Sequence, residues 1–147
     1  MSDDLSGWTR LTAAAQGIRI ATGEQETLAE VFRDLLEIGH VDVVQPDLAR
    51  AGGFTQARRI GDYAALNHAL CVPHSWKSGI LVAATVHFAA TLARIPFIEN
   101  IVTRSTLRRE LVRTDFQVSG GVASVPQTPG LGIELNEDVL NRYRIDR

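Results

Sequence analysis

The feature that most limits the possible folds of this chain is a repeat. Short apolar segments recur along the sequence, and each is followed by one ionisable side chain. Four residues occupy these positions, and the intervals between neighbours are 23, 27 and 25 residues: Glu24, Asp47, His74 and Glu99. Such an interval accommodates one strand and one helix, which is the connection that neighbouring parallel strands require. Because parallel strands end at the same edge of a sheet, we expect these four side chains to share one rim.

The segments around this repeat show the spacing of amphipathic helices and of buried strands. Helices are expected over about 3–15, 55–67 and 79–93, and strands over 18–21, 41–44, 69–72 and 96–98. A further helix is expected to begin at a capping box of Thr27 and Glu30 and to stop at Gly39. The strand segments are continuous apolar runs, as in strands that are buried on both faces. Beyond residue 103, short segments with turn signals precede a polar helix near 136–142.

This alternation predicts an α/β fold in which helices cover parallel strands. Open doubly wound sheets and (β/α)8 barrels both have this order of elements. The common rim favours a barrel, because barrel enzymes build their active sites at the carboxyl ends of the strands. With 147 residues, 45% of them hydrophobic and 22% charged, the chain has the size and composition of one globular domain.

Charge and cysteine content exclude several classes of protein. A net charge of −2 predicts no attraction to nucleic acid or to an anionic membrane surface. No run approaches the roughly 18 apolar residues of a membrane span, and the N-terminal sequence lacks the pattern of a signal peptide. The single cysteine, Cys71, cannot form an internal disulfide, which fits a reducing compartment. A cytoplasmic protein without nucleic-acid or membrane partners is therefore expected.

Each of the four rim residues also has an ordinary structural explanation. Glu24 fits a negative charge at the beginning of the next helix, and Asp47 fits a turn or cap residue after a proline. His74 fits a hydrogen-bonded histidine at a strand end, and Glu99 fits a solvated carboxylate. The regular spacing argues against this reading, because four independent explanations would have to coincide in register.

The residue types at this rim suit proton transfer beside a metal ion. An aspartate and a histidine at neighbouring strand ends suit an acid–base pair, because the carboxylate holds the imidazole tautomer and stabilises its protonated form. A glutamate one strand earlier suits a ligand of a hard cation such as Mg²⁺. A metal ion next to a general base is the arrangement that removes a proton adjacent to a carboxylate and stabilises the resulting enediolate.

Several motifs occur in the order and spacing of a known family: Ala-Thr-Gly-Glu at 21–24, Val-Asp-Val-Val-Gln-Pro-Asp-Leu at 41–48, Gly-Gly at 52–53, Val-Pro-His at 72–74 and Phe-Ile-Glu-Asn at 97–100. The tail Pro-Gly-Leu-Gly-Ile-Glu-Leu at 129–135 also matches the segment with which chains of that family finish. On these motifs the sequence resembles the enolase superfamily, in its mandelate racemase subgroup. The resemblance extends over essentially the whole chain.

The resemblance implies a role for each rim residue. Glu24 matches the third of three carboxylates that bind Mg²⁺. Asp47 and His74 match the pair that acts as general base or acid, and Glu99 matches the acid that hydrogen-bonds the developing enediolate opposite the metal. The histidine separates this subgroup from the muconate-lactonizing relatives, which use lysines instead.

The resemblance also implies a reaction and a class of substrate. The expected activity is Mg²⁺-dependent abstraction of the proton α to a carboxylate, on a small hydroxy acid or sugar acid. Dehydration is the first expectation and racemisation the second. Lys77 and Arg50 follow His74 and Asp47 in their loops and are predicted to contact this substrate, with surface exposure as the alternative.

The resemblance covers only part of a family member. Members have an N-terminal capping domain and a (β/α)7β barrel, whereas this chain matches the last βα units and a C-terminal segment. We therefore expect an incomplete barrel over 1–102 and a return segment toward the capping region over 103–147. The strands that bear the lysine base and the first two metal carboxylates have no match here, so Mg²⁺ binding by the isolated chain is expected to be weak or absent.

An incomplete barrel leaves strand edges open, and open edges favour pairing with another chain. A complementing N-terminal half or a homo-oligomer is expected to cover them. One subunit of a split enzyme and a truncated remnant without catalytic activity are the alternatives.

Overall fold

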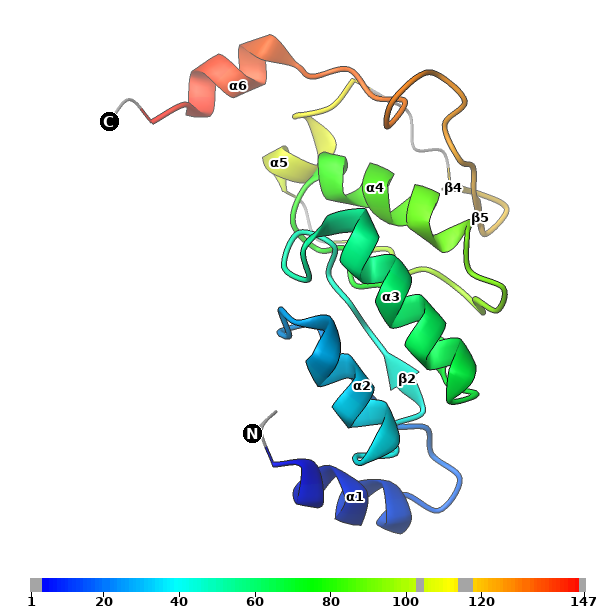
Figure 1. Cartoon of the computed structure of the whole chain (residues 1–147). Helices are drawn as coiled ribbons and strands as arrows, with labels where there is room; N and C mark the ends of the chain where they lie inside the picture. The colour runs from blue at the N-terminus through cyan, green and yellow to red at the C-terminus, as the bar shows by residue number, and fades with distance from the viewer. Residues whose placement is uncertain (1–3, 103–104, 114–117, 146–147) are drawn as a thin grey trace.

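The computed structural model of the chain describes residues 4–102, 105–113 and 118–145 (Figure 1). The helices are α1 (Leu5–Ala14), α2 (Ala29–Glu37), α3 (Gly53–Leu66), α4 (Gly79–Ala89), α5 (Thr106–Arg109) and α6 (Glu137–Tyr143). The strands are β1 (Ala21–Thr22), β2 (Val43–Val44), β3 (Leu70–Cys71), β4 (Val118–Ser119) and β5 (Val122–Ala123). Within these residues, every helix is too short or too polar to cross a membrane.

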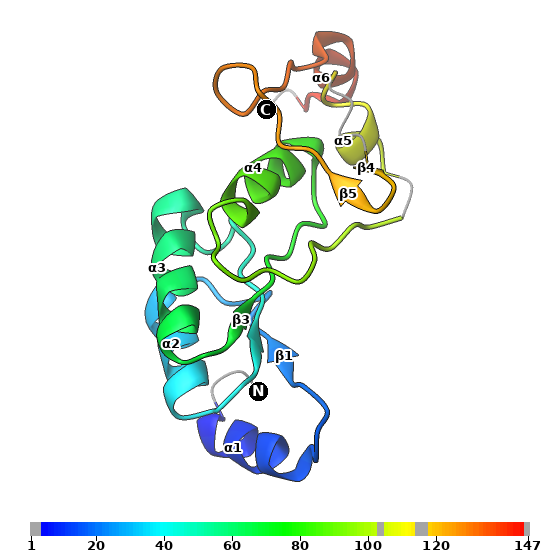
Figure 2. The ribbon, with the colours of Figure 1, turned by 90° about the vertical axis from the view of Figure 1, so that its right-hand side faces the viewer.

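The strands β1, β2 and β3 form one parallel sheet in the order of the chain (Figure 2). Ala21 pairs with Val43, which pairs on its other side with Leu70. An isolated parallel bridge between Asp47 and His74 continues the pairing of β2 with β3 beyond the strand ends. The sheet is not closed, since β1 and β3 remain its edges. The predicted α/β part-barrel is therefore confirmed.

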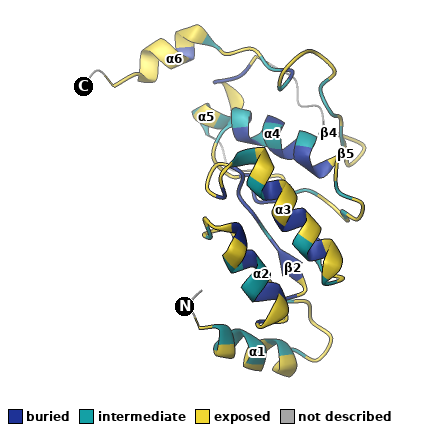
Figure 3. Cartoon of the chain, viewed as in Figure 1, coloured by how far each residue is buried: buried dark blue, intermediate teal, exposed yellow. Residues whose placement is uncertain are grey.

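The main core lies between this sheet and the inner faces of α2, α3 and α4 (Figure 3). Phe32 and Leu35 of α2 are fully buried against Ile60 of α3 and Val44 of β2. Their spacing along each helix is the apolar stripe that the sequence predicts. Full burial of one such side chain stabilises the fold by about 1.5–3 kcal/mol.

A glycine shapes the turn that carries the first rim residue. Gly23 has a φ of +115°, and a Cβ at this position would lie 2.5 Å from Cε1 of the buried Phe32. Both the backbone conformation and the close approach exclude a larger side chain. The turn after β1 therefore depends on glycine, and Glu24 follows it directly.

The predicted capping box at the start of α2 is wrong. The helix begins at Ala29, and its N-cap is Leu28, which makes no side-chain cap hydrogen bond. Thr27 lies one residue before this N-cap. The carboxylate of Glu30 instead accepts a hydrogen bond from Arg59 of α3 at 3.1 Å. The Glu30 side chain therefore forms an ion pair between two packed helices and does not form the capping box.

The predicted strand over residues 96–98 is also wrong, because this segment has no strand pairing. Pro96 has no N–H to donate to a ladder. The segment is joined to the region of the sheet through a side chain, since Gln45 Nε2 donates to Glu99 Oε1 at 2.7 Å. A side-chain contact holds this segment where a backbone ladder was expected.

Helix boundaries agree with the prediction to within a few residues, except at the end of α4. This helix stops at Ala89, four residues before the predicted end. Both the amide and the hydroxyl of Thr91 donate to the carbonyl oxygen of Phe88, which closes the last turn. Residue 3, where the first helix was expected to begin, lies outside the described residues.

The last third of the chain lies beyond α4, on the side away from the sheet (Figures 1 and 2). The β4–β5 hairpin pairs Val118 with Ala123, and an antiparallel bridge joins Val112 to Leu135. The final helix α6 forms where it was expected, with Asn136 as its N-cap. The boundary at 102/103 and the role of this part as a return segment toward a capping region stay predictions, and residues 103 and 104 lie outside the described part.

Candidate functional site

Asp47 is the fully buried centre of the candidate site. One carboxylate oxygen, Oδ1, accepts a hydrogen bond from the Ala49 amide at 2.9 Å. The other, Oδ2, lies 3.1 Å from His74 Nδ1 and 2.8 Å from Lys77 Nζ. Burying a carboxylate is costly unless it is paired and hydrogen-bonded. These three contacts offset that cost and use both oxygens.

His74 follows β3 and lies beside Asp47, with 7% of its surface exposed. Its backbone N–H donates to the carbonyl oxygen of Pro46 at 3.1 Å, which fixes the residue next to the end of β2. The second ring nitrogen, Nε2, lies 3.6 Å from Glu24 Oε2. Trp76 packs on the imidazole, with 5.2 Å between ring centroids. If Nδ1–H is donated to Asp47, Nε2 is the nitrogen that can accept a proton at the rim.

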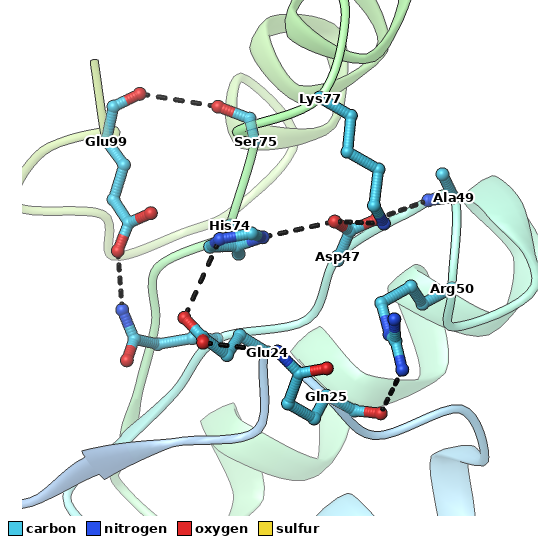
Figure 4. Close-up of polar contacts among 10 residues, drawn as sticks. Glu24, Gln25, Asp47, Ala49, Arg50, His74, Ser75, Lys77 and Glu99 are labelled. Carbon is cyan, nitrogen blue, oxygen red and sulfur yellow. Dashed lines mark hydrogen bonds and ion pairs between the residues drawn. The ribbon is translucent and has the colours of Figure 1, made fainter. Parts of the chain in front are cut away.

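Glu24 faces the same imidazole from the end of β1 (Figure 4). Its side chain is 46% exposed, and Gln25 Nε2 donates to its Oε1 at 3.4 Å. Three neighbouring strand ends thus bring Glu24, His74 and Asp47 into one chain of contacts. This is the arrangement that the spacing of the apolar runs predicts.

Glu99 reaches the rim through a residue that the sequence analysis missed. Gln45 Nε2 donates to Glu99 Oε1 at 2.7 Å, and Ser75 Oγ donates to the Glu99 carbonyl oxygen at 3.4 Å. The second carboxylate oxygen, Oε2, is buried and has no hydrogen-bond partner in the part of the chain that the structure describes. Gln45 precedes Asp47 by two positions, and side chains two apart on a strand share a face. That period could have identified it.

The two residues predicted to contact substrate make protein contacts in this structure (Figure 4). Lys77 donates to Asp47, as described above, and its side chain is 47% exposed. Arg50 Nη2 donates to the carbonyl oxygen of Gln25 at 3.1 Å, away from the imidazole. Contact of either residue with substrate stays a prediction.

The side chains at this rim do not form a complete metal site. Across residues 4–102, 105–113 and 118–145, no three His, Cys, Asp or Glu residues are grouped so that they could hold a metal ion. Glu24 offers one carboxylate, while Asp47 is occupied by three donors. Mg²⁺ takes six ligands in near-octahedral geometry, so one carboxylate leaves most of its shell to water.

Cys71 lies in β3, close to the site in sequence, yet does not add a nucleophile. Burial raises the pKa of its thiol to about 12. The reactive form of cysteine is the thiolate, so this residue is inert at neutral pH. It fills space in the core between the sheet and the helices.

Comparisons with known proteins identify the family. The family model described as "Enolase C-terminal domain-like" matches residues 1–139. The chain is 34% identical to D-galactarolactone cycloisomerase of Agrobacterium fabrum, over 97% of this chain and 40% of that protein. It is 31% identical to L-rhamnonate dehydratase of Saccharopolyspora erythraea, over 98% of this chain and 37% of that protein.

A solved structure shows the same architecture. The mandelate racemase/muconate lactonizing enzyme from Jannaschia sp. CCS1 matches with a TM-score of 0.88 and 33% identity, over 100% of this chain and 37% of that one. The chain thus spans about 40% or less of the length of these relatives. The unclosed parallel sheet agrees with that coverage, since it is one part of a barrel. The chain belongs to the enolase superfamily and corresponds to the C-terminal part of a mandelate racemase-like member.

Proposed function

We propose that this chain supplies the acid–base part of an active site that removes the proton next to the carboxylate of a sugar acid or another hydroxy acid. The observation that carries the proposal is the 3.1 Å contact of His74 Nδ1 with the fully buried Asp47, at the ends of adjacent parallel strands. The carboxylate holds the ring in the tautomer whose Nε2 accepts a proton. Relatives named as a sugar acid dehydratase and a sugar lactone cycloisomerase support the substrate class.

Dehydration is the reaction that we place first. His74 Nε2 takes the proton from the α-carbon, and the electron pair of that C–H bond moves toward the carboxylate to give an enediolate. The enediolate then expels the hydroxyl group of the adjacent carbon, and His74 returns its proton to that group, so water leaves. Glu99, which Gln45 holds at the rim, is proposed to hydrogen-bond the enediolate.

Racemisation is the second candidate, because a solved relative bears the name mandelate racemase/muconate lactonizing enzyme. It begins with the same proton transfer to His74. It then requires a second base on the opposite face of the carbon. Incorporation of solvent deuterium without loss of water distinguishes racemisation from dehydration.

Glu24 is proposed to contribute one carboxylate to a Mg²⁺ ion. The ion, when bound, would stabilise the negative charge that develops on the substrate carboxylate. Since no three His, Cys, Asp or Glu side chains are grouped among the described residues, binding by this chain alone is expected to be weak. His74 would accept the proton, and the ion, with ligands completed from the rest of the barrel, would stabilise the charge left on the substrate.

The open sheet is proposed to be covered by another copy of the chain or by a segment equivalent to the rest of the barrel. Both β1 and β3 are edges, and unpaired strand edges are templates for pairing. Light scattering of the 147-residue chain should therefore show an oligomer at micromolar concentration. A stable monomer under these conditions would contradict self-association.

The test of the proposed activity uses a complete barrel. This chain replaces the matching part of the Jannaschia sp. relative, and NMR follows the α-protons of a panel of sugar acids in D₂O. We expect deuterium exchange or dehydration of at least one acid, whereas the isolated chain should show neither. Failure of the complete barrel to exchange any of these protons would contradict the proposal.

Two variants assign the roles in that barrel. His74→Asn should lower exchange by at least about a hundredfold, because the base is lost. Asp47→Asn should also lower it, since an amide cannot offset the charge of an imidazolium. His68→Asn is the matched control, because His68 is exposed and precedes β3, at the opposite end of the strand from His74. Undiminished exchange in His74→Asn would refute the assignment.

A further inference from the structure

One charged contact of Asp47 has no part in the reaction proposed above. Lys77 Nζ donates to Asp47 Oδ2 at 2.8 Å, and His74 Nδ1 lies 3.1 Å from the same oxygen (Figure 4). The other oxygen accepts from the Ala49 amide at 2.9 Å. Two of the three partners of this carboxylate therefore share one oxygen, and Lys77 is the nearer of the two.

We propose that Lys77 is a positioning residue of the acid–base pair. Its ammonium keeps Asp47 Oδ2 turned toward His74 Nδ1, and the carboxylate in turn keeps the imidazole in one tautomer and one orientation. The catalytic meaning of this role rests on the proposed function. The positioning itself is a property of the chain without substrate.

Burial shows why the carboxylate needs such a partner. Asp47 is fully buried, while the side chain of Lys77 is 47% exposed and reaches inward from the loop before α4. Among the described residues, Lys77 is the only lysine or arginine that pairs with Asp47. A neutral imidazole can hydrogen-bond the carboxylate but carries no charge to balance it. The ammonium supplies that charge from the solvent side.

The residue type is specific to this position. Lys77 is the only lysine in the sequence, and the other 14 of the 15 basic residues are arginines. An arginine binds a carboxylate with a planar fork that occupies both oxygens. At Asp47 that fork would compete with both His74 and the Ala49 amide. A compact ammonium can share one oxygen with the imidazole and leave the other free for the amide.

The backbone on both sides of Lys77 is anchored. Ser78 caps α4, since its Oγ accepts a hydrogen bond from the Leu81 amide at 3.2 Å. Ser75 Oγ donates to the Glu99 carbonyl oxygen at 3.4 Å. The ammonium therefore extends from a short loop whose two ends are held, which suits a positioning role.

The experiment reads the His74 tautomer directly in the 147-residue chain. Long-range ¹H–¹⁵N spectra of the ¹⁵N-histidine-labelled chain, at one neutral pH, distinguish Nδ1–H from Nε2–H. We expect a single Nδ1–H tautomer with a slowly exchanging ring proton. In Lys77→Met, we expect a mixture of tautomers and ring-proton exchange at least about tenfold faster, since a carboxylate that has lost its charge-assisted bond reorients.

Chemical rescue separates positioning from a general loss of structure. The thiolate introduced by Lys77→Cys displaces bromide from 2-bromoethylamine and gives a side chain of lysine length that ends in an ammonium. Cys71 should remain unmodified, because burial raises the pKa of its thiol to about 12. Aminoethylation should restore the single tautomer. Lys77→Arg should not give the single tautomer. As a control, Arg58→Met breaks an exposed ion pair on α3 and should leave the His74 signals unchanged.

The outcomes distinguish this inference from the proposed function. An unchanged tautomer in Lys77→Met, or no recovery on aminoethylation, would overturn the positioning role whether or not the barrel is active. Should Lys77→Met fail to fold, Lys77→Cys before and after aminoethylation gives the same comparison. In an active complete barrel, Lys77→Met should lower kcat at least about tenfold with little change in KM. An inactive barrel with the expected tautomers would refute the reaction and leave the positioning role intact.

Discussion

The region over residues 21–89 and the region over residues 95–145 bury their apolar side chains to different extents. The main core cluster runs from Ala29 to Phe88 and lies wholly within the first region. In the second, Leu111, Val112 and Val139 are buried outside that cluster, and Phe97 and Val102 are 63% and 82% exposed. The first region therefore folds around its own core, while the second takes its position from what it packs against.

The same difference separates the parts of the candidate site. His74 and Asp47 lie just beyond the paired strands of the first region, where a backbone bridge joins them and their side chains are in contact at 3.1 Å. Glu99 belongs to the second region and is held by the side chain of Gln45 and a contact from Ser75. The side chains proposed to transfer the proton thus lie at the ends of paired strands, while the group proposed to hydrogen-bond the enediolate belongs to a segment without strand pairing.

The largest expected effect comes from removing a phenylalanine in each region. Phe32→Ala opens a cavity in the core and should destabilise the chain by about 3–5 kcal/mol. Phe97→Ala removes an exposed ring and should change the free energy of unfolding by less than about 0.5 kcal/mol. Urea unfolding measures both. Similar losses for the two variants would break the comparison between the regions.

A smaller effect is expected where the two regions meet. A Cβ on Gly79, at the start of α4, would contact Val112 and lie 2.8 Å from the Arg108 carbonyl oxygen. Gly79→Ala should therefore push α5 away from α4 and destabilise the chain by about 1–3 kcal/mol. Hydrogen exchange should accelerate in residues 105–113 and stay slow in α2.

Gly7→Ala is the control for that variant. Its Cβ would meet the exposed carboxylate of Asp4, the N-cap of α1, which accepts a hydrogen bond from the Gly7 amide. Disturbing this cap costs about 1 kcal/mol or less, and alanine is the better helix former, so the net change should be smaller than at Gly79. Equal destabilisation by both substitutions would show that the junction at Gly79 is not tightly packed.

Alkaline pH should weaken the first region through Cys71. Burial raises the pKa of this thiol from 9.0 to about 12 in the folded chain. The unfolded chain therefore ionises first, so this contribution to stability is complete below about pH 9 and is lost as pH rises through about 12. Unfolding at a series of pH values, compared with Cys71→Ala, isolates this contribution. A pH dependence that persists in the variant would assign it to other groups.

The smallest effect is expected for Mg²⁺. Glu24 is the rim carboxylate proposed to bind it, and no group of three metal-ligating side chains occurs among the described residues, so calorimetry of the isolated chain should give an affinity weaker than about 1 mM. Glu24→Gln should reduce the heat further, and Glu26→Gln two residues away should not. Submicromolar affinity would show that the region over residues 95–145 supplies further ligands. The two regions would then both contribute to the metal site.

Local sequence was sufficient for the order of the elements as far as α4 and for three of the four rim residues. The apolar stripe of α2 indicates which face of the helix is buried. The continuous apolar runs of β2 and β3 indicate strands that are buried on both faces. The interval of one strand and one helix then places Glu24, Asp47 and His74 at the same edge. These conclusions hold because periodicity is a local property.

Tertiary structure decided the features that depend on a partner distant in sequence. Glu30 pairs with Arg59 rather than closing a capping box, because packing of α2 on α3 offers it a cation. Residues 96–98 lack a ladder, since a strand exists only where a neighbour accepts its hydrogen bonds.

The pairing of Lys77 with Asp47 was likewise invisible in sequence, because the two are 30 residues apart and meet only where β2 and β3 end side by side. A short-range pattern shows which face of an element is buried. Which charged group meets a buried carboxylate is settled by how those elements pack, because only packing brings the two atoms within hydrogen-bond distance.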